Sequence, residues 1–378
     1  MRIAIVIAIA LTFFSCKKIE EPDNSFDPIA EQLNLPTTPF NYANQPLPAH
    51  MVINQLLNVD NTPAHNTVTD HGATLGRVLF YEKALSKNNS VSCASCHKQE
   101  LGFSDNATFS EGWNGGKTHR HSMGLINAKY YFSGKFFWDE RASSLEELVL
   151  IPIQDSVEMG LTLSEMKDRL IDLPYYKPLF KNAFGSDAIT TEKAAFALSQ
   201  FIRSIVSYRS KYDVGRAEAT SLFDPFSNFS EEENLGKTLF NSYQDVRCNS
   251  CHGSDAFVAT GGRNNGLDLT TKDGGIGDVT GAQEEMSLFK APSLKNIILR
   301  APYMHDGRFA TIEEVIEHYN SGVQNHPNLD QGLKDFDTGL PRPMNMTKED
   351  KLALIAFLHT LTDSALIVDE KYADPFKS

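Results

Sequence analysis

The chain has 378 residues, of which 41% are hydrophobic and 22% charged, and its formal net charge is −13. A chain of this length is expected to form about two or three domains with packed cores, and its hydrophobic content excludes an intrinsically disordered protein. The acidic balance excludes nucleic acid as an expected partner, because phosphate backbones are bound by basic surfaces.

Residues 1–15 have the pattern of a signal peptide. Arg2 precedes an apolar run over residues 3–14, and this run is too short to span a bilayer. The small residue before Cys16 is typical of the site where a bacterial lipoprotein is cleaved and then acylated on cysteine. We therefore predict a lipoprotein signal peptide, export to the periplasm and a membrane anchor through a lipid on Cys16. A plain secretory signal, in which Cys16 has no role, is the alternative.

Two short cysteine motifs are the strongest indication of a cofactor in this sequence. They are Cys93-Ala94-Ser95-Cys96-His97 and Cys248-Asn249-Ser250-Cys251-His252. Cys-x-x-Cys-His is the attachment signal of c-type haem, because two thiols add across two vinyl groups of the porphyrin and the next imidazole ligates the iron. We therefore predict two covalently bound haem c groups, with His97 and His252 as iron ligands. A disulfide in each pair, or one zinc ion held by all four cysteines, is the alternative.

A weak internal repeat predicts two related domains. The sequence LGRVLF over residues 75–80 is similar to LGKTLF over residues 235–240, and each precedes one cysteine motif. Such similarity is typical of tandem copies of one structural unit. We predict an N-terminal tether and lead-in over residues 16–70, a first haem domain over residues 71–220 and a second over residues 221–378.

Helical patterns are frequent, whereas strand-like alternation is scarce. One apolar helix face begins at Thr191 and another after Thr347. Capping boxes are predicted at Ser144 with Glu147, Ser230 with Glu233 and Thr311 with Glu314. The glycine-rich segment 261–281 is predicted to be a loop. The expected fold is mostly α, with two tandem class I cytochrome c-like haem domains and long loops around the haems.

Further motifs follow each attachment site. They are Phe137-Trp138-Asp139-Glu140-Arg141-Ala142, Ser156-Val157-Glu158-Met159-Gly160, Phe289-Lys290-Ala291-Pro292-Ser293-Leu294-Lys295-Asn296 and Ala301-Pro302-Tyr303-Met304-His305-Asp306-Gly307. Together they resemble the bacterial di-haem cytochrome c peroxidase family, which includes the methylamine-utilisation di-haem enzymes that oxidise tryptophans of a partner protein. The resemblance extends from about residue 72 to residue 360.

The resemblance implies that the two haems have different roles. The haem on His97 would meet peroxide, and the haem on His252 would relay electrons from a donor protein. Trp138 would lie between the haems, and Glu158 would stand over the first iron as the acid–base residue. A carboxyl group in a partly dry pocket suits that role, because desolvation raises its pKa. The alternatives are a surface carboxylate for Glu158 and a core aromatic for Trp138.

Two departures from the family pattern concern the first haem. Many members have a histidine that caps the iron in the loop after the first attachment site, and Glu111 stands at that position here. His119 and His121 follow closely and could replace it, or they are ordinary polar loop residues. We predict that the first haem is largely five-coordinate and active without prior reduction. Leu148 replaces a glutamine that is usual in the family, so a hydrogen bond near the first haem is expected to be missing.

A third departure concerns the second haem. Many members ligate it with a methionine fourteen residues after the histidine of the His-Asp-Gly motif, and Tyr319 occupies that position here, as it does in the partner-oxidising members. A phenolate ligand lowers the potential of the iron relative to a methionine thioether. Tyr319 is the predicted ligand, an ordinary core tyrosine is the alternative role for it, and Met304 and Met344 are alternative ligands.

A fourth departure concerns calcium, which family members bind between the domains. The asparagine that usually helps to bind this ion corresponds to His121, and imidazole is a poor ligand for calcium. The carbonyl groups of Arg300 and Pro302 remain as ligands, so calcium is kept as a further candidate cofactor.

The sequence therefore predicts a di-haem cytochrome c peroxidase. It would reduce hydrogen peroxide to water with electrons from a small exported cytochrome c or cupredoxin, and the resemblance also allows a homodimer. One alternative is a tyrosine-ligated enzyme that oxidises a partner protein or small substrate. Another is a non-catalytic di-haem electron-transfer cytochrome. Glu111 in place of the capping histidine, together with Glu158, favours an enzyme.

Overall fold

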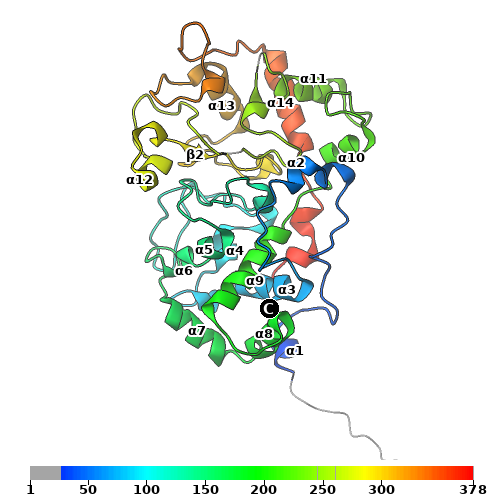
Figure 1. The fold of residues 1–378 in the computed structure, drawn as a ribbon, viewed down its shortest axis with the longest axis vertical. Coiled ribbons are helices and arrows are strands. Elements are labelled where there is room, and N and C mark those ends of the chain that lie inside the picture. The colour runs from blue at the N-terminus through cyan, green and yellow to red at the C-terminus, as the bar shows by residue number, and fades with distance from the viewer. Residues whose placement is uncertain (1–26, 245, 260, 378) are drawn as a thin grey trace, which may run out of the picture.

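The computed structural model describes residues 27–244, 246–259 and 261–377. These residues form a mostly helical fold of two lobes, which Figure 1 shows one above the other. The first lobe contains α1 (Pro28–Gln32), α3 (Asp70–Tyr81), α4 (Cys93–Cys96), α5 (Leu145–Leu148), α6 (Ile151–Gln154), α7 (Leu163–Asp172), α8 (Tyr176–Phe184) and α9 (Thr191–Ser204). The second lobe contains α10 (Lys211–Glu218), α11 (Glu231–Phe240), α12 (Ile276–Thr280), α13 (Ile312–Glu317) and α14 (Lys348–Thr360), with α2 (Asn54–Leu57) at its edge. The described sheet consists of β1 (Gly262–Arg263) and β2 (Phe289–Lys290), which pair antiparallel. The prediction of a mostly α fold is confirmed.

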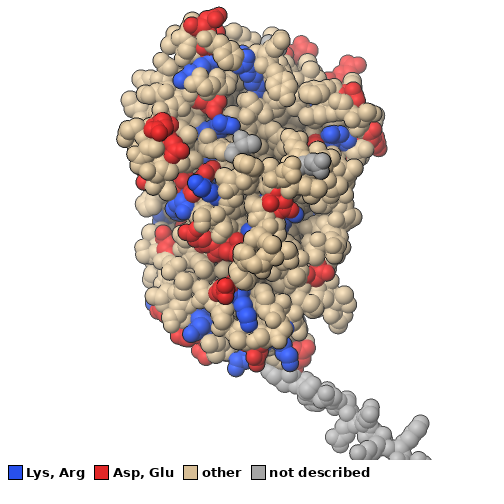
Figure 2. Space-filling view, in the orientation of Figure 1, with Lys and Arg blue, Asp and Glu red and all other residues tan. Residues whose placement is uncertain are grey.

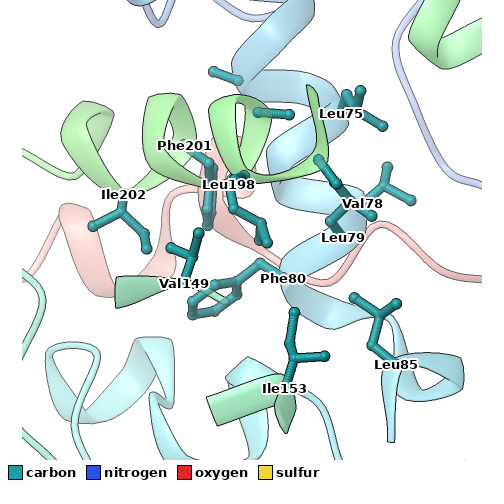
Figure 3. Close-up of a cluster of buried hydrophobic side chains, with 14 of the residues drawn as sticks. Leu75, Val78, Leu79, Phe80, Leu85, Val149, Ile153, Leu198, Phe201 and Ile202 are labelled. Carbon is teal, nitrogen blue, oxygen red and sulfur yellow. The ribbon is translucent and has the colours of Figure 1, made fainter. Parts of the chain in front are cut away.

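The core of the first lobe forms where α3 crosses α9. Gly76 permits this approach, because a Cβ atom at Gly76 would lie 2.8 Å from the Cβ atom of Phe201 and closer still to the carbonyl group of Ala197. Figure 3 shows Phe80 of α3 beside Leu198 and Phe201 of α9 in the centre of the cluster. These side chains are almost completely buried, and burial of such apolar surface is the main force that stabilises a core.

The second lobe repeats this helix crossing with α11 and α14. A Cβ atom at Gly236 would lie 2.8 Å from the Cβ atom of Phe357 and would overlap the carbonyl group of Ala353. Gly76 and Gly236 are the equivalent glycines of the sequence repeat. The repeat therefore marks the same close packing of two helices in both lobes.

The predicted helix starts agree with the observed caps in most places. The boxes at Ser230 and Thr311 are complete and begin α11 and α13, and Thr347 caps α14 in the same way. The box at Ser144 is incomplete, because Glu147 accepts hydrogen bonds from Ser143 instead. The glycine-rich segment 261–281 is not entirely a loop, since it contains β1 and α12.

The described part of the predicted tether is packed against the fold. Tyr42 is buried in the first core, and its hydroxyl donates a hydrogen bond to the carbonyl of Lys371 at 2.6 Å. His50 contacts Asp213 of the second lobe at 3.2 Å. Met51 and Leu56 then join a small apolar cluster between the lobes. The reading of this segment as a free tether is therefore wrong from residue 27 onward, because its apolar side chains find partners that a sequence pattern does not show.

The C-terminal segment returns to the first lobe. After α14 the chain runs back along the molecule, and Figure 1 shows its end beside α3, α8 and α9. Leu366 and Tyr372 belong to the first core, and the hydroxyl of Tyr372 donates a hydrogen bond to the carbonyl of Ser204 at 2.6 Å. Residues 366–376 thus complete the first lobe, although the sequence assigns them to the second haem domain.

The predicted signal peptide over residues 1–15 and the lipid site at Cys16 lie outside the described residues. Among residues 27–377, apart from the two undescribed positions, no helix combines the length and apolarity that a membrane span requires. Figure 2 shows acidic and basic side chains mixed over one face of the molecule.

Candidate functional site

Two adjoining cavities contain the residues that the motifs single out. The first cavity is lined by Cys96, His97 and Glu158, among other residues. The second is lined by Cys248, Cys251, His252 and Tyr319, among other residues. The residues that border both cavities are His121, Ser122, Met123, Gly124, Trp138, Lys290 and Pro292. The structure therefore places the two cysteine motifs on either side of a thin shared wall.

The first motif forms a single helical turn that ends at its histidine. Ser92 and Ser95 make a capping box at the start of α4, and His97 is the residue that caps its end. The Nδ1 atom of His97 lies 3.1 Å from the carbonyl oxygen of Phe103, so Nδ1–H can donate there and leave Nε2 as an acceptor. Burial lowers the pKa of His97 more than this carbonyl raises it. The imidazole is therefore neutral, which is the form that ligates a metal.

The second motif has a similar arrangement in the other lobe. Arg247, with a φ of 56°, precedes a 3₁₀ turn at Cys248–Ser250. Burial lowers the pKa of His252 to about 4, against the opposing effect of the carbonyl groups of Phe257 and Pro292. This imidazole is also neutral near pH 7 and faces its cavity.

The described cysteines do not support the disulfide or zinc alternatives. All four thiols of the two motifs are free, and the two pairs line different cavities. A four-cysteine zinc site would need all four sulfur atoms around one ion. Among the residues that the structure describes, no three His, Cys, Asp or Glu side chains lie close enough together to bind a metal ion.

The residues of both cavities fit a covalently attached haem. The first cavity offers the thiol of Cys96, the second cavity offers those of Cys248 and Cys251, and each has a neutral imidazole on the same short turn. The lining of the second cavity is mainly apolar, as a porphyrin requires. Haem would supply a redox-active iron, and the chain would supply its ligands, its orientation and its electrostatic surroundings.

Glu158 lies in the first cavity with His97, as the sequence predicts. The segment before it turns at Asp155, whose carboxylate accepts the backbone N–H of Glu158 at 3.1 Å. The backbone N–H of Trp113 donates to the carbonyl oxygen of Glu158 at 3.0 Å and fixes the turn. Burial, with a smaller contribution from the Asp155 carboxylate, raises the pKa of Glu158 to about 7 against the opposing effect of Arg141. A carboxyl group with this pKa can hold or release a proton near neutral pH.

Glu111, at the position of the capping histidine, and the two candidate ligands His119 and His121 are placed differently. Glu111 points into solvent and pairs with Lys117 at 2.8 Å, and this contact holds the pKa of Glu111 below its usual value. His119 is exposed at the edge of the first cavity. His121 is buried, and its Nδ1 lies 3.0 Å from the carbonyl oxygen of Ala107. Its Nε2 has no hydrogen-bond partner among the described residues, so His121 is the better placed of the two histidines.

Trp138 forms part of the wall between the cavities. Its indole N–H donates to the carbonyl oxygen of His121 at 2.8 Å, which fixes the ring. The ring meets His305 edge to face with centroids 6.4 Å apart, and His305 stacks on Phe289 at 3.8 Å. The conjugated rings of Trp138, His305 and Phe289 therefore lie in contact one after another, starting from the wall between the cavities.

Tyr319 reaches the second cavity through a local change of helix type. The sequence predicts one continuous helix after Thr311, but α13 ends at Glu317 and a π-helical turn over His318–Gly322 follows. Such turns are frequent at functional sites. Asn265 donates its amide N–H groups to the Tyr319 hydroxyl and to the Met304 sulfur, both at 3.4 Å. Burial raises the pKa of Tyr319 above its usual value.

All three predicted ligands of the second haem line this cavity. Tyr319, Met304 and Met344 are each part of its wall. Met304 has a φ of 76°, which is unusual for a residue with a side chain. The structure thus brings the candidates together without selecting one of them.

The calcium expectation does not fit the residues present. His121 offers a nitrogen where an oxygen ligand is needed. The guanidinium of Arg300 is close enough to His121 to lower the pKa of its imidazole, and a second cation there is unfavourable.

Sequence reasoning missed several residues of the site. Arg120 forms a bidentate ion pair with Asp273 of the second lobe, with two contacts of 2.8 Å, and also contacts Asp139. Lys290 and Arg300 line the second cavity as buried cations. Both lie within or beside the quoted motifs. Their burial arises from long-range packing and has no signature in the sequence.

Comparison with known proteins places these features in context. The sequence model of the di-haem cytochrome c peroxidase family matches residues 70–220. The chain is 31% identical to the methylamine utilization protein MauG of Methylophilus methylotrophus, over 80% of this chain and 86% of that protein. It is 32% identical to the cytochrome c551 peroxidase of Nitrosomonas europaea, over 77% of this chain and 79% of that protein. The crystal structure of a MauG-like protein associated with microbial copper homeostasis is similar with a TM-score of 0.74 and 33% identity, covering 88% of this chain and 99% of that chain.

Proposed function

This chain belongs to the di-haem cytochrome c peroxidase family, and on that premise we propose that it reduces hydrogen peroxide to water. Each turnover would consume two protons and two electrons, which a small exported cytochrome c or cupredoxin would supply. The family implies two c-type haems. We assign one to Cys93, Cys96 and His97, and the other to Cys248, Cys251 and His252.

The observation that carries this proposal is the position of Glu158 in the cavity of His97. Heterolytic cleavage of peroxide needs a proton to move from one oxygen atom to the other. Glu158 can accept and return that proton, because burial brings its pKa to about 7. Glu111, which stands at the position of the family's capping histidine, is exposed and pairs with Lys117, so we propose that it does not cap the first iron and that a small oxidant can reach this iron. The first haem would then be largely five-coordinate at rest.

Trp138 would help electrons to pass between the two haem sites. It borders both cavities, and its indole is fixed by the hydrogen bond to His121. The second lobe would receive electrons from the donor, and the first lobe would use them. On this assignment residues 71–220 form the peroxidatic haem domain and residues 221–378 the electron-transfer haem domain, with the C-terminal segment packed back onto the former.

A second candidate function follows from Tyr319. Its hydroxyl lies in the second cavity beside Met304. A tyrosine ligand would lower the potential of the second haem, and a low potential suits the storage of oxidising equivalents for a partner protein or small aromatic substrate. The similarity to MauG proteins supports this candidate. The likeness to a protein associated with copper homeostasis suggests a copper-related partner as one class to test.

Export and assembly complete the proposal. We propose a periplasmic protein that a lipid on Cys16 anchors to a membrane, and that forms a homodimer. Mass spectrometry of the mature protein tests the lipid and both haems together, since each adds a defined mass.

Peroxide kinetics test the proposed function directly. Haem-loaded protein is mixed with hydrogen peroxide, with and without reduced cytochrome c, and haem absorption and cytochrome oxidation are followed. We expect a rapid change in the haem spectrum and turnover that falls by about 10²- to 10⁴-fold in Glu158→Gln. Glu111→Gln is the matched control and should retain the wild-type rate.

The outcomes separate the candidate functions. A haem spectrum that ignores peroxide, together with resting EPR signals of only six-coordinate iron, would identify a non-catalytic electron-transfer cytochrome. A fast spectral change without oxidation of any donor protein would favour the partner-oxidising enzyme. Undiminished turnover in Glu158→Gln would remove Glu158 from the mechanism.

A further inference from the structure

Two buried cations line the haem cavities without a carboxylate partner. Arg300 is 4% exposed and Lys290 is 5% exposed. Both line the second cavity, and Lys290 also lines the first. Neither makes an ion pair with an acidic side chain of the described residues. A buried charge is costly unless another charge or several hydrogen bonds compensate it.

The guanidinium of Arg300 is fixed but incompletely satisfied. One Nη atom donates to the carbonyl oxygen of Ser293, and Nε has no partner among the described residues. Gly124 makes room for this side chain, because a Cβ atom at Gly124 would lie 2.9 Å from Cδ and 3.1 Å from Cζ of Arg300. Packing therefore holds the Arg300 guanidinium in the wall of the second cavity, and its Nε–H group lacks a hydrogen-bond acceptor among the described residues.

The ammonium group of Lys290 is in a similar position. It donates to the carbonyl oxygen of Lys135 at 3.3 Å and lies over the rings of Tyr131 and Phe136, at 3.7 and 4.3 Å from their centroids. These contacts orient the charge, but a weak hydrogen bond and cation–π contacts only partly replace its hydration. Burial lowers the pKa of Lys290 to about 7, and the tertiary structure places this amino group where the two cavities meet.

Three other buried cations in the described residues have compensating partners, whereas a fourth, Arg77, donates to the carbonyl oxygen of Lys371 at 3.3 Å and leaves its Nε without a partner away from both cavities. Lys295 pairs with Asp213 at 2.6 Å, and Arg203 pairs with Glu146. Lys237 instead bonds two backbone carbonyl groups, at 2.7 and 2.8 Å. None of these three lines a haem cavity. Arg300 and Lys290 differ because they line the cavities that a cofactor would fill.

We infer that Arg300 and Lys290 bind the propionate carboxylates of the two haems, Arg300 in the second cavity and Lys290 at the shared wall. Each haem c carries two propionates, so the cofactors themselves bring the missing negative charges into the structure. Charge-assisted contacts of this kind are short and directional, and a guanidinium can bind a carboxylate through two parallel hydrogen bonds. Because the thioether bonds would already fix one edge of each porphyrin, the two cations would hold its propionate groups. Their positive charge would also favour the reduced state of the haems.

Redox titration of the haem-loaded protein tests this inference without any peroxide. Midpoint potentials of both haems are measured by spectroelectrochemistry over a range of pH for wild type, Arg300→Met and Arg300→Lys. Arg300→Met should lower the potential of the second haem and make it depend on pH, because an unpaired buried propionate takes up a proton. Arg300→Lys keeps the charge and should restore most of the wild-type potential. Lys290→Met should lower the potentials of both haems.

Lys237→Met is the matched control, since Lys237 is equally buried but lies outside the cavities. It should lose stability while both potentials stay at wild-type values. Unchanged potentials and pH dependence in both Arg300→Met and Lys290→Met would overturn the inference. If these variants do not fold, a crystal structure of the wild-type haem-loaded protein decides. Nitrogen–propionate distances of about 3 Å would support the inference, and acidic side chains or water alone at both cations would refute it. Because neither measurement uses peroxide, failure here is separable from failure of the proposed activity.

Discussion

The substitution Glu158→Gln is expected to stabilise the folded protein at alkaline pH while it impairs the reaction with peroxide. The pKa of Glu158 rises from 4.5 to about 7 because the side chain is buried in the first cavity beside Asp155. Glutamine has nearly the shape of the protonated acid and carries no charge at any pH. The variant therefore removes the cost of ionisation and removes the proton carrier at the same time.

The magnitude follows from the difference in proton binding between the folded and unfolded chains. Folded Glu158 holds its proton more tightly, so its contribution to stability is complete below pH 4.5 and is lost as the pH rises to about 7. One pKa unit corresponds to about 1.4 kcal/mol, so the rise of the Glu158 pKa from 4.5 to about 7 amounts to about 3 kcal/mol of stability. Residual solvent contact at this half-buried side chain reduces the effect, so we expect a gain of about 1 to 3 kcal/mol for the variant above pH 7.

Urea unfolding of the haem-loaded protein at pH 5 and pH 8 measures this gain. Glu158→Gln should unfold at a higher urea concentration than wild type at pH 8, and at nearly the same concentration at pH 5. Glu111→Gln serves as control, because its exposed carboxylate pairs with Lys117 and carries no desolvation cost. Equal stability of wild type and Glu158→Gln at pH 8 would refute the claim that this carboxylate is desolvated.

Three further predictions concern the helix crossing, the second cavity and a buried ion pair of the second lobe. Gly236→Ala should lower the free energy of unfolding by about 1 to 3 kcal/mol, because the new methyl group overlaps the Ala353 carbonyl in α14; thermal unfolding measures this. Tyr319→Phe should change the absorption and EPR spectra of the second haem if, as proposed, Tyr319 ligates its iron. Asp213→Asn should cost about 3 to 5 kcal/mol, since it leaves the buried Lys295 ammonium unpaired. Burial raises the pKa of Asp213, but Lys295 and other partners outweigh burial and lower this pKa to about 2. The stability that the ionised Asp213 gives to the wild-type protein should therefore be lost as the pH falls from 3.8 towards 2.

Matched substitutions keep these predictions testable. Gly261→Ala should be nearly neutral, because no atom lies within 4 Å of the added methyl group. Tyr303→Phe lines the same cavity as Tyr319 and should leave the spectrum unchanged. Asp335→Asn should have a small effect, because Asp335 is only half-buried and an amide oxygen can still accept the hydrogen bonds from Asp337 and Thr338. A Tyr319→Phe spectrum identical to that of wild type would exclude Tyr319 as a ligand and leave Met304 and Met344.

The sequence predicts the local features of this protein well. Helix caps at Ser230, Thr311 and Thr347 depend on residues three positions apart. Of the predicted boxes at Ser144, Ser230 and Thr311, those at Ser230 and Thr311 form as expected. The exception is Ser144, where the neighbouring serine competes for the same carboxylate. The repeat around Gly76 and Gly236 also predicts correctly that the two lobes share a design, because close helix crossings require glycine at one fixed position.

The sequence by itself thus determined the two Cys-x-x-Cys-His motifs, the family and the helical class of the fold, because each depends on short spacings or on motifs that are contiguous in the chain. Only the tertiary structure decided that Trp138 and Lys290 share one wall, that Tyr319 enters its cavity through a π-helical turn, and that the C-terminal segment completes the first lobe. These features depend on contacts between residues far apart in the chain. They also depend on desolvation, which gives Glu158 its proton affinity and leaves Arg300 in need of a counter-ion. Neither is a property of any single stretch of sequence.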